Sequence, residues 1–311
     1  MKARLWSVLL LVATCAMAGA ASAHTTYPLT VRDDGGATVV LQQAPQRILS
    51  LTLPSDEILL ALVDKARIVG VTSYAADPLV SNVATMLTPG MKLMTLNPEA
   101  VLGLRPDLVI VANWSDAASV KQLRDAGLTV YLLAAGLSVP SIEEKIRALG
   151  TLTDTAARAT DLVARMDARL AAVSAKVAGI PAEKRVRVMD YATWGSSQGR
   201  GSSWDEIITR AGAIDAVGDK TADQWGQVPL SKENILQISP DILILPGWVD
   251  GDPKGATAFF TQITSDPGLQ TLAAVRNKRV SMMPEYLKST TSQYIVDAVE
   301  WLARTAYPSL F

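Results

Sequence analysis

The sequence predicts an α/β protein made of two Rossmann-like lobes with parallel sheets, joined by a single long helix. The first observation is an internal repeat, in which residues 98–111 align with residues 232–245. Each copy is typical of a short helix, a Pro-Asp turn and a continuous apolar strand of the kind buried in a parallel sheet. The second observation is a run of helix-forming residues at 142–178, between the two copies. A duplicated unit on either side of a helical segment indicates two similar lobes.

Strands and helices are expected to alternate within each lobe, as in parallel sheets covered on both faces. Ser55 is a suitable start for the first helix, because Asp56 and Glu57 then place acidic groups in its first turn. The expected elements outside the repeats are strands at 47–51, 68–71, 130–133, 185–190 and 279–282, and helices at 55–62, 117–126, 203–211 and 259–264.

The segment between the lobes has the pattern of an amphipathic helix. Leu162, Met166 and Leu170 recur every four residues, with charged residues between them. Asp154 and Thr155 interrupt the pattern, which predicts one helix followed by a longer one. A long helical connection of this kind is expected to be stiff. The expected units are a signal peptide at 1–23, an N-terminal lobe at 24–140, connecting helices at 141–180 and a C-terminal lobe at 181–311.

The N-terminus has the pattern of a secretory signal peptide. Lys2 and Arg4 precede an apolar stretch at 5–18, and a small-residue pattern ending at Ala23 follows it. We expect cleavage near Ala23 and export of the mature chain. A lipid anchor on Cys15 is the less favoured alternative, because threonine is a poor fit immediately before a lipidated cysteine.

Composition excludes several classes of function. Lysine and arginine number 29 against 30 acidic residues, so there is no basic excess for binding nucleic acid. His24 and Cys15 are the single histidine and cysteine, which excludes a histidine or thiolate metal cage and any His-dependent catalytic triad. An exported enzyme that uses carboxylates as acid and base is an alternative. The candidate residues are Asp205, Glu206 and Asp250, although acidic residues also occur near one another by chance.

Five segments of the chain resemble periplasmic solute-binding proteins of ABC importers for cobalamin, ferric siderophores and haem, most closely the cobalamin-binding members. These segments are residues 47–51, 57–62, 68–74, 98–111 and 199–212, and the resemblance covers most of 45–306. It implies a class III fold, with two lobes bridged by a rigid helix, and a solute held between them. It also implies a periplasmic protein that delivers its solute to an inner-membrane permease, has no enzymatic activity or resident cofactor, and is a monomer.

The same resemblance gives a role to one acidic residue in each repeat. In the cobalamin-binding members a surface glutamate of each lobe pairs with arginines of the permease, and Glu99 and Glu233 match these positions. The alternative is that both are ordinary first-turn acids, which the helix dipole favours by about 0.3–1 kcal/mol.

Aromatic residues follow several of the expected strands. The carboxyl ends of strands are where an open α/β sheet binds its ligand, and a large flat solute is well held by tryptophan and tyrosine faces. Core packing or loop anchoring is the alternative for each aromatic residue. With one nearby base, the candidate ligand-binding residues are Tyr74, Trp114, Trp194, Trp225, Trp248, Tyr286 and Arg200.

Charge in these loops separates the possible solutes. Anionic siderophore chelates require several inward bases, whereas Arg200 and Lys288 are the main ones expected here. The low number of bases favours a corrinoid. Haem is an alternative, because Tyr74 lies where the haem-binding members place a tyrosinate ligand. A protein that binds only a macromolecular partner, with no solute, is a further alternative.

Overall fold

The N-terminal part of the protein is built on a five-stranded sheet. The computed structural model describes residues 24–223 and 226–311. The strand order is β5-β4-β3-β6-β7, and every neighbouring pair is parallel. The elements are β3 Ile48–Ser50, α1 Leu53–Leu62, β4 Ile68–Thr72, β5 Lys92–Met94, α2 Pro98–Leu104, β6 Leu108–Ala112, α3 Ala117–Asp125 and β7 Val130–Leu133, preceded by an antiparallel hairpin of β1 Leu29–Arg32 and β2 Thr38–Leu41.

Both faces of this sheet are buried, as the apolar strand at the repeat predicts. Alternate residues of a strand point to opposite faces. Leu108 and Ile110 of β6 pack in the same cluster as the apolar side of α1, whereas Val109 and Val111 pack with residues of α2 and α3. The α/β fold class is therefore confirmed, with helices on each side of a parallel sheet.

The C-terminal lobe repeats this plan with four parallel strands in the order β10-β8-β12-β13. Its helix α8 begins at Gly255, a turn before the expected start at 259. The elements are β8 Arg187–Asp190, β9 Ser196–Gln198, α6 Ser203–Arg210, β10 Ile214–Asp215, β11 Gln227–Pro229, α7 Lys232–Ile238, β12 Ile242–Pro246, α8 Gly255–Ser265, α9 Ala273–Arg276, β13 Val280–Met283, α10 Glu285–Lys288 and α11 Ile295–Ala306.

The sequence repeat is a repeat of structure down to individual hydrogen bonds. Helices α2 and α7 are both seven residues long, and each ends at a residue with φ of 47°. The following Asp107 accepts a hydrogen bond from the backbone of Arg47 at 2.8 Å, and Asp241 accepts one from Arg187 at 2.8 Å. The side chain of Arg47 donates a hydrogen bond to the last carbonyl of α2, and that of Arg187 donates one to the last carbonyl of α7, each at 2.6 Å. The Pro-Asp turn therefore ties each repeat to the first strand of its sheet.

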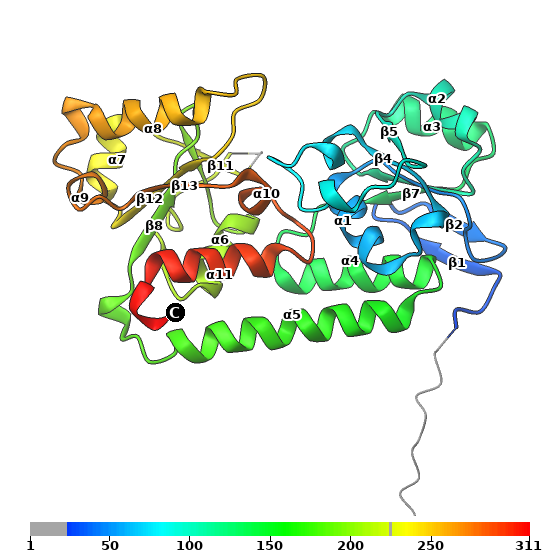
Figure 1. Ribbon diagram of the computed structural model, residues 1–311, viewed down its shortest axis with the longest axis horizontal. Helices are drawn as coiled ribbons and strands as arrows, with labels where there is room; N and C mark the ends of the chain where they lie inside the picture. Colours follow the sequence, from blue (N-terminus) through cyan, green and yellow to red (C-terminus); the bar gives the residue numbers. More distant parts are fainter. Residues whose placement is uncertain (1–23, 224–225) are drawn as a thin grey trace, which may run out of the picture.

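Two consecutive helices join the lobes, as the interrupted pattern predicts. Helix α4 covers Val139–Leu152 and α5 covers Ala156–Val177, with Asp154 at a φ of 58° between them. Helix α5 runs beneath both lobes, and α11 lies against it (Figure 1). Arg169 of α5 pairs with Asp297 and Glu300 of α11 at 2.7 and 2.9 Å. One large apolar cluster continues from α1 through α4 and α5 to α6 and α11, so the lobes share a core.

None of the helices in the described ranges 24–223 and 226–311 has both the length and the apolar character needed to cross a membrane. The expected signal peptide and Cys15 lie outside these ranges.

Candidate functional site

The strand order reverses once in each sheet, and this reversal marks where an α/β sheet usually binds its ligand. In the N-terminal sheet it lies between β3 and β6, and in the C-terminal sheet between β8 and β12. The segments after β4 and after β13 meet between the lobes. There Asn82 donates a hydrogen bond to the carbonyl oxygen of Tyr286 at 2.7 Å. The carboxyl ends of the two sheets therefore face a shared region.

A pocket of about 180 Å3 lies at the strand reversal of the C-terminal lobe. Trp194 follows β8 and Trp248 follows β12, so the structure brings together two aromatic residues that are 54 positions apart in the chain. The lining residues come from the ends of β8, β12 and β13, from α10 and from the antiparallel pair of β9 and β11. They are Asp190, Ala192, Thr193, Trp194, Gln198, Gln227, Pro246, Trp248, Val249, Asp250, Glu285, Lys288 and Ser289.

A buried ion pair lies at this pocket. The Lys288 Nζ atom is 2.9 Å from Asp190 Oδ2, with side-chain exposures of 8% and 1%. Burial lowers the pKa of Lys288, but the Asp190 carboxylate more than offsets it, so the pKa is raised and the ammonium stays charged. The other oxygen of Asp190 accepts hydrogen bonds from Ser197 Oγ at 2.6 Å and from the Gln198 backbone at 2.9 Å. The pair is therefore neutral overall and held in position by β9.

Lys288 also lies over an aromatic ring. Its ammonium is 5.7 Å from the ring centroid of Trp204, which is fully buried in α6. A cation over an indole face is attracted by the ring quadrupole. Trp204 is therefore a core residue that touches the pocket only through Lys288, as the core-packing alternative for the aromatic residues predicts.

Two other expected ligand-binding aromatics lie on the N-terminal lobe and are strongly exposed. Tyr74 follows β4 and is 55% exposed, and Trp114 follows β6 and is 65% exposed. Trp194, on the C-terminal lobe, is 74% exposed. Large aromatic side chains left in solvent at strand ends are candidates for contact with a ligand, because they bury little area in the protein itself.

The remaining expected residues lie elsewhere. Tyr286 packs against the large shared core. Arg200 does not line the pocket: its Nε donates to the Gly218 carbonyl at 2.6 Å, and it borders a separate depression with Asp215 and other acidic residues. Trp225 lies outside the described residues.

Two of the three acids considered for catalysis have structural partners, and the third, Asp250, lines the pocket. Asp205 accepts a hydrogen bond from the Gly201 backbone at 2.8 Å. Glu206 accepts one from the Val139 backbone at 3.0 Å and pairs with Arg210 at 3.0 Å, so it caps the start of α4. These bonds account for both side chains without a catalytic role.

A buried glutamate, Glu57, connects the two lobes, whereas the sequence pattern indicated it only as an acid at the start of a helix. Glu57 of α1 accepts hydrogen bonds from the backbone and side-chain nitrogens of Asn82 at 3.0 and 2.8 Å, and from Ser292 Oγ of the opposite lobe. Gln293 donates to the Glu57 carbonyl at 2.8 Å. Burial raises the pKa of Glu57, and these hydrogen bonds oppose the rise. The side chain therefore holds the start of α11 against the N-terminal lobe.

The neighbouring Asp56 forms no ion pair with a cation in the part of the chain that the structure describes. It is fully buried, and its Oδ2 atom accepts hydrogen bonds from the backbone and hydroxyl of Thr72 at 3.1 and 2.6 Å. Burial raises its pKa to about 8, with the Thr72 hydrogen bonds opposing the shift and the charge of Glu57 adding to it. At neutral pH this carboxyl group is mostly protonated.

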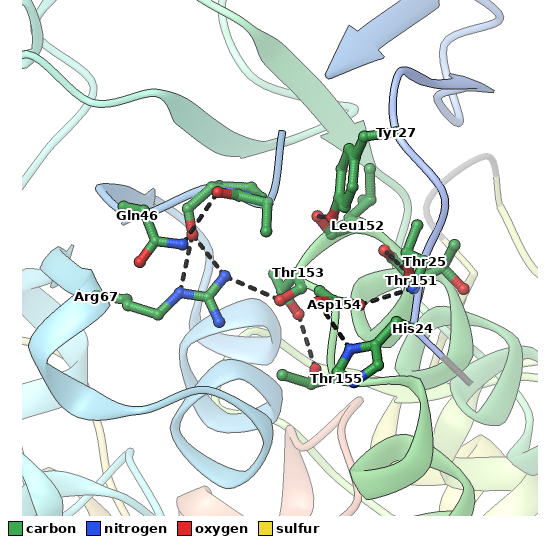
Figure 2. Close-up of polar contacts among 12 residues, drawn as sticks. His24, Thr25, Tyr27, Gln46, Arg67, Thr151, Leu152, Thr153, Asp154 and Thr155 are labelled. Atoms are coloured by element: carbon green, nitrogen blue, oxygen red, sulfur yellow. Dashed lines mark hydrogen bonds and ion pairs between the residues drawn. The ribbon is translucent and has the colours of Figure 1, made fainter. Parts of the chain in front are cut away.

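The single histidine lies at the junction of α4 and α5. His24 Nδ1 lies 3.4 Å from Asp154, whose other oxygen accepts a hydrogen bond from the Thr25 backbone at 2.7 Å (Figure 2). Arg67 donates to the carbonyl of Thr153 at 2.8 Å in the same region. These contacts attach the start of the described chain to the junction. No group of three or more metal-ligating side chains occurs within the described residues.

The two glutamates of the repeat are exposed in the first turns of α2 and α7, on different lobes (Figure 1). A hydrogen bond from Ser231 lowers the pKa of Glu233. Lys232 beside it pairs with Asp266. Glu233 therefore presents a charged carboxylate at the surface.

A family model described as periplasmic binding protein matches residues 48–287, which is most of the chain and includes both sheets. The chain belongs to this family. The proteins similar to it include a cobalamin-binding protein of Halobacterium salinarum, which is 30% identical over 75% of this chain and 62% of its own length. The chain thus spans less than two thirds of that relative.

Two further similarities cover more of both proteins. An uncharacterized ABC transporter substrate-binding lipoprotein of Bacillus subtilis, YvrC, is 27% identical over 100% of this chain and 98% of its own length. The molybdate-bound structure of the Haemophilus influenzae periplasmic binding protein MolA superposes with a TM-score of 0.75 and 22% identity, over 91% of this chain and 92% of that one. The second similarity shows that the two chains share the class III fold of this family.

Proposed function

We propose that this protein is the solute-binding component of an ABC importer, that it captures a corrinoid between its lobes, and that it delivers it to an inner-membrane permease. The observation that carries the proposal is the pocket at the strand reversal of the C-terminal lobe. Its Trp194 and Trp248 supply flat apolar surface, and its one lysine, Lys288, is neutralised by Asp190. A large flat solute of low charge fits this combination.

The proposed site joins this pocket to the exposed aromatics of the other lobe. Tyr74 and Trp114 follow strands of the N-terminal sheet whose carboxyl ends face the same region. We also assign to the site Tyr286, which is partly buried and packs against the shared core, and Trp225, which lies outside the described residues. Arg200, which binds Gly218, is assigned to its border.

A titration of the mature protein with cyanocobalamin, cobinamide, haemin, a ferric hydroxamate and molybdate tests the solute, with binding followed by calorimetry and by the ligand spectrum. We expect 1:1 corrinoid binding that Trp194→Ala and Trp248→Ala weaken by about tenfold or more, because each removes buried apolar contact. Trp301→Phe, a change in α11 away from the pocket, is the matched control. A haem complex lost in Tyr74→Phe would replace the corrinoid by haem.

We also propose that Glu99 and Glu233 bind the permease. Their support is that they occupy equivalent first turns in the two repeats and that both are exposed. Paired charges on two lobes orient a loaded protein on a partner and raise the rate of association.

The docking proposal is tested by Glu99→Arg and Glu233→Arg together, in solute uptake by vesicles that contain the permease. We expect uptake to fall to background while solute affinity stays within about twofold. Glu144→Arg with Glu183→Arg is the control, since both are exposed acids outside the repeats. Lost solute affinity in the Glu99 and Glu233 variant would contradict the assignment.

The functional units in this proposal are the lobes at 24–140 and 181–311 and the connecting helices at 141–180. We further propose that the mature protein begins near His24 and acts as a monomer in the periplasm, with lipidation of Cys15 as the alternative. Mass spectrometry of the mature chain distinguishes the two, because a lipidated protein would begin at Cys15 and carry acyl mass.

A further inference from the structure

The ionisable groups of the C-terminal pocket give it an acidic surplus. Four such groups line it: Asp190, Asp250, Glu285 and Lys288. Lys288 and Asp190 neutralise each other at 2.9 Å. Asp250 and Glu285 form no ion pair with any described residue, although the charge of Glu285 adds to that of Asp190 in raising the pKa of Lys288, and Glu285 accepts a hydrogen bond from the Ser289 hydroxyl. Two formal negative charges therefore remain at the pocket.

The loops of the N-terminal lobe that face the same region supply no positive charge. The segments that follow β3, β4, β6 and β7 are residues 51–52, 73–91, 113–116 and 134–138, and they contain neither lysine nor arginine. They do contain Asp77 and Asp116. Asp77 accepts a backbone hydrogen bond from Leu79 at 2.9 Å, and Asp116 accepts one from Ser119 at 2.8 Å. These bonds hold both carboxylates in place on the N-terminal lobe.

Of the described bases in the C-terminal strand-end loops, only Lys288 lines the pocket. Arg200 is bound to the Gly218 carbonyl and borders another depression. Lys254 lies at the start of α8 and does not line the pocket. Lys288 is buried and paired.

On this basis, and resting on the proposed solute-binding function, we infer that the pocket selects a solute that is neutral or cationic and rich in N–H donors, and that Asp250 and Glu285 determine this specificity by repelling anions. Carboxylate and amide oxygens at the pocket accept hydrogen bonds from donors on the solute, and Gln198 and Gln227 add side-chain amides. An oxyanion or a polycarboxylate would meet uncompensated acids in a partly desolvated site, which is unfavourable.

The test compares two corrinoids that share one core but differ in charge: the dicyano forms of cobinamide, which carries amides, and of cobyrinic acid, which carries carboxylates. Calorimetry at low and at physiological salt gives both dissociation constants. We expect the wild-type protein to bind the amide form at least about tenfold more tightly, with a smaller preference at high salt because screening weakens the repulsion.

The variant Asp250→Asn with Glu285→Gln assigns the preference to these two residues. We expect it to bind the carboxylate form about three- to tenfold more tightly than wild type, so that the preference for the amide form falls, and a thermal unfolding midpoint close to that of wild type shows that the variant is folded. The control Asp219→Asn with Glu183→Gln removes two exposed acids elsewhere and should leave the preference unchanged.

The outcomes separate the inference from the function it rests on. Equal binding of the two corrinoids by wild type, or an unchanged preference in the Asp250 and Glu285 variant, overturns the inference and leaves corrinoid binding standing. Binding of neither form by wild type overturns the corrinoid function itself, and with it the inference. Tighter binding of molybdate or haemin than of cobinamide would show that the pocket accepts anions and would also overturn it.

Discussion

The two lobes share a backbone plan but use their buried acids differently. In the N-terminal lobe, Asp56 is buried without a cation, and Glu57 beside it binds the opposite lobe. In the C-terminal lobe, Asp190 is paired with Lys288 at the edge of an open pocket. The two repeats therefore share the turn that ties each of them to its sheet, whereas their strand ends differ: one side forms a contact between the lobes and the other lines a pocket.

The largest effect is expected from breaking the ion pair. Lys288→Met would leave the Asp190 carboxylate buried without its partner, which costs about 3–5 kcal/mol of unfolding free energy. Urea denaturation measures the loss. The double variant Asp190→Asn with Lys288→Gln should recover much of it, because no buried charge remains. If Lys288→Met were as stable as wild type, the loss of the lysine would not destabilise the protein, and this would contradict the expected cost of leaving the buried Asp190 unpaired.

The acid without a cation should give the protein a pH-dependent stability. Because burial raises the pKa of Asp56 to about 8, its folded-state pKa lies above its unfolded value near 4. The native state therefore holds this proton longer, so the contribution of Asp56 to stability is fully present below about pH 4 and is lost as the pH rises to about 8. The expected slope is at most about 1.4 kcal/mol per pH unit between these values.

Asp56→Asn isolates this term, since asparagine keeps an acceptor for Thr72 without an ionisable proton. We expect denaturation midpoints of the variant to decline less from pH 5 to pH 8 than those of wild type. The raised pKa of Glu57 acts in the same direction, so a smaller decline should persist. Equal pH profiles would show that Asp56 ionises normally.

The contact between the lobes should contribute a smaller but measurable amount. Glu57→Ala removes an acceptor from Asn82 and from Ser292, which leaves buried donors without a partner at a cost of about 1–3 kcal/mol. Hydrogen exchange at residues 292–295 should accelerate, because the start of α11 loses its tie to the N-terminal lobe. Glu144→Ala, an exposed change on α4, should alter neither; unchanged exchange in the Glu57 variant would contradict the bridging role.

The smallest effects should be equal in the two lobes. Asn97 caps α2 and Ser231 caps α7, each by accepting a backbone hydrogen bond, at 3.0 and 3.2 Å. Asn97→Ala and Ser231→Ala should each cost about 1 kcal/mol. Thermal unfolding measures both. A difference greater than about 1 kcal/mol between them would show that the repeats are less equivalent than their hydrogen bonds indicate.

Sequence patterns predicted the fold well because its elements depend on local signals. The duplicated helix, Pro-Asp turn and apolar strand predicted both parallel sheets, and the break at Asp154 predicted the two connecting helices. The antiparallel pairs β1 with β2 and β9 with β11 were not predicted. Their strands are only three or four residues long, too short for a clear alternation of apolar and polar residues.

The candidate site was predictable in part. Trp194 and Trp248 follow strands, so the rule for parallel sheets placed them at one edge, and the pocket has both in its wall. The same rule included Tyr286, whose partly buried side chain packs against the shared core, since a sequence position does not give the direction of a side chain.

By itself, the sequence determined the α/β class, the two repeats, the connecting helices and the scarcity of bases near the strand ends, because these depend on composition and on periodicity along the chain. Only the tertiary structure decided that Lys288 pairs with Asp190 and that Glu57 binds Ser292. Those partners lie 98 and 235 positions apart. The folding of both sheets and the packing of α11 on α5 bring them within bonding distance, and burial then gives each contact its strength.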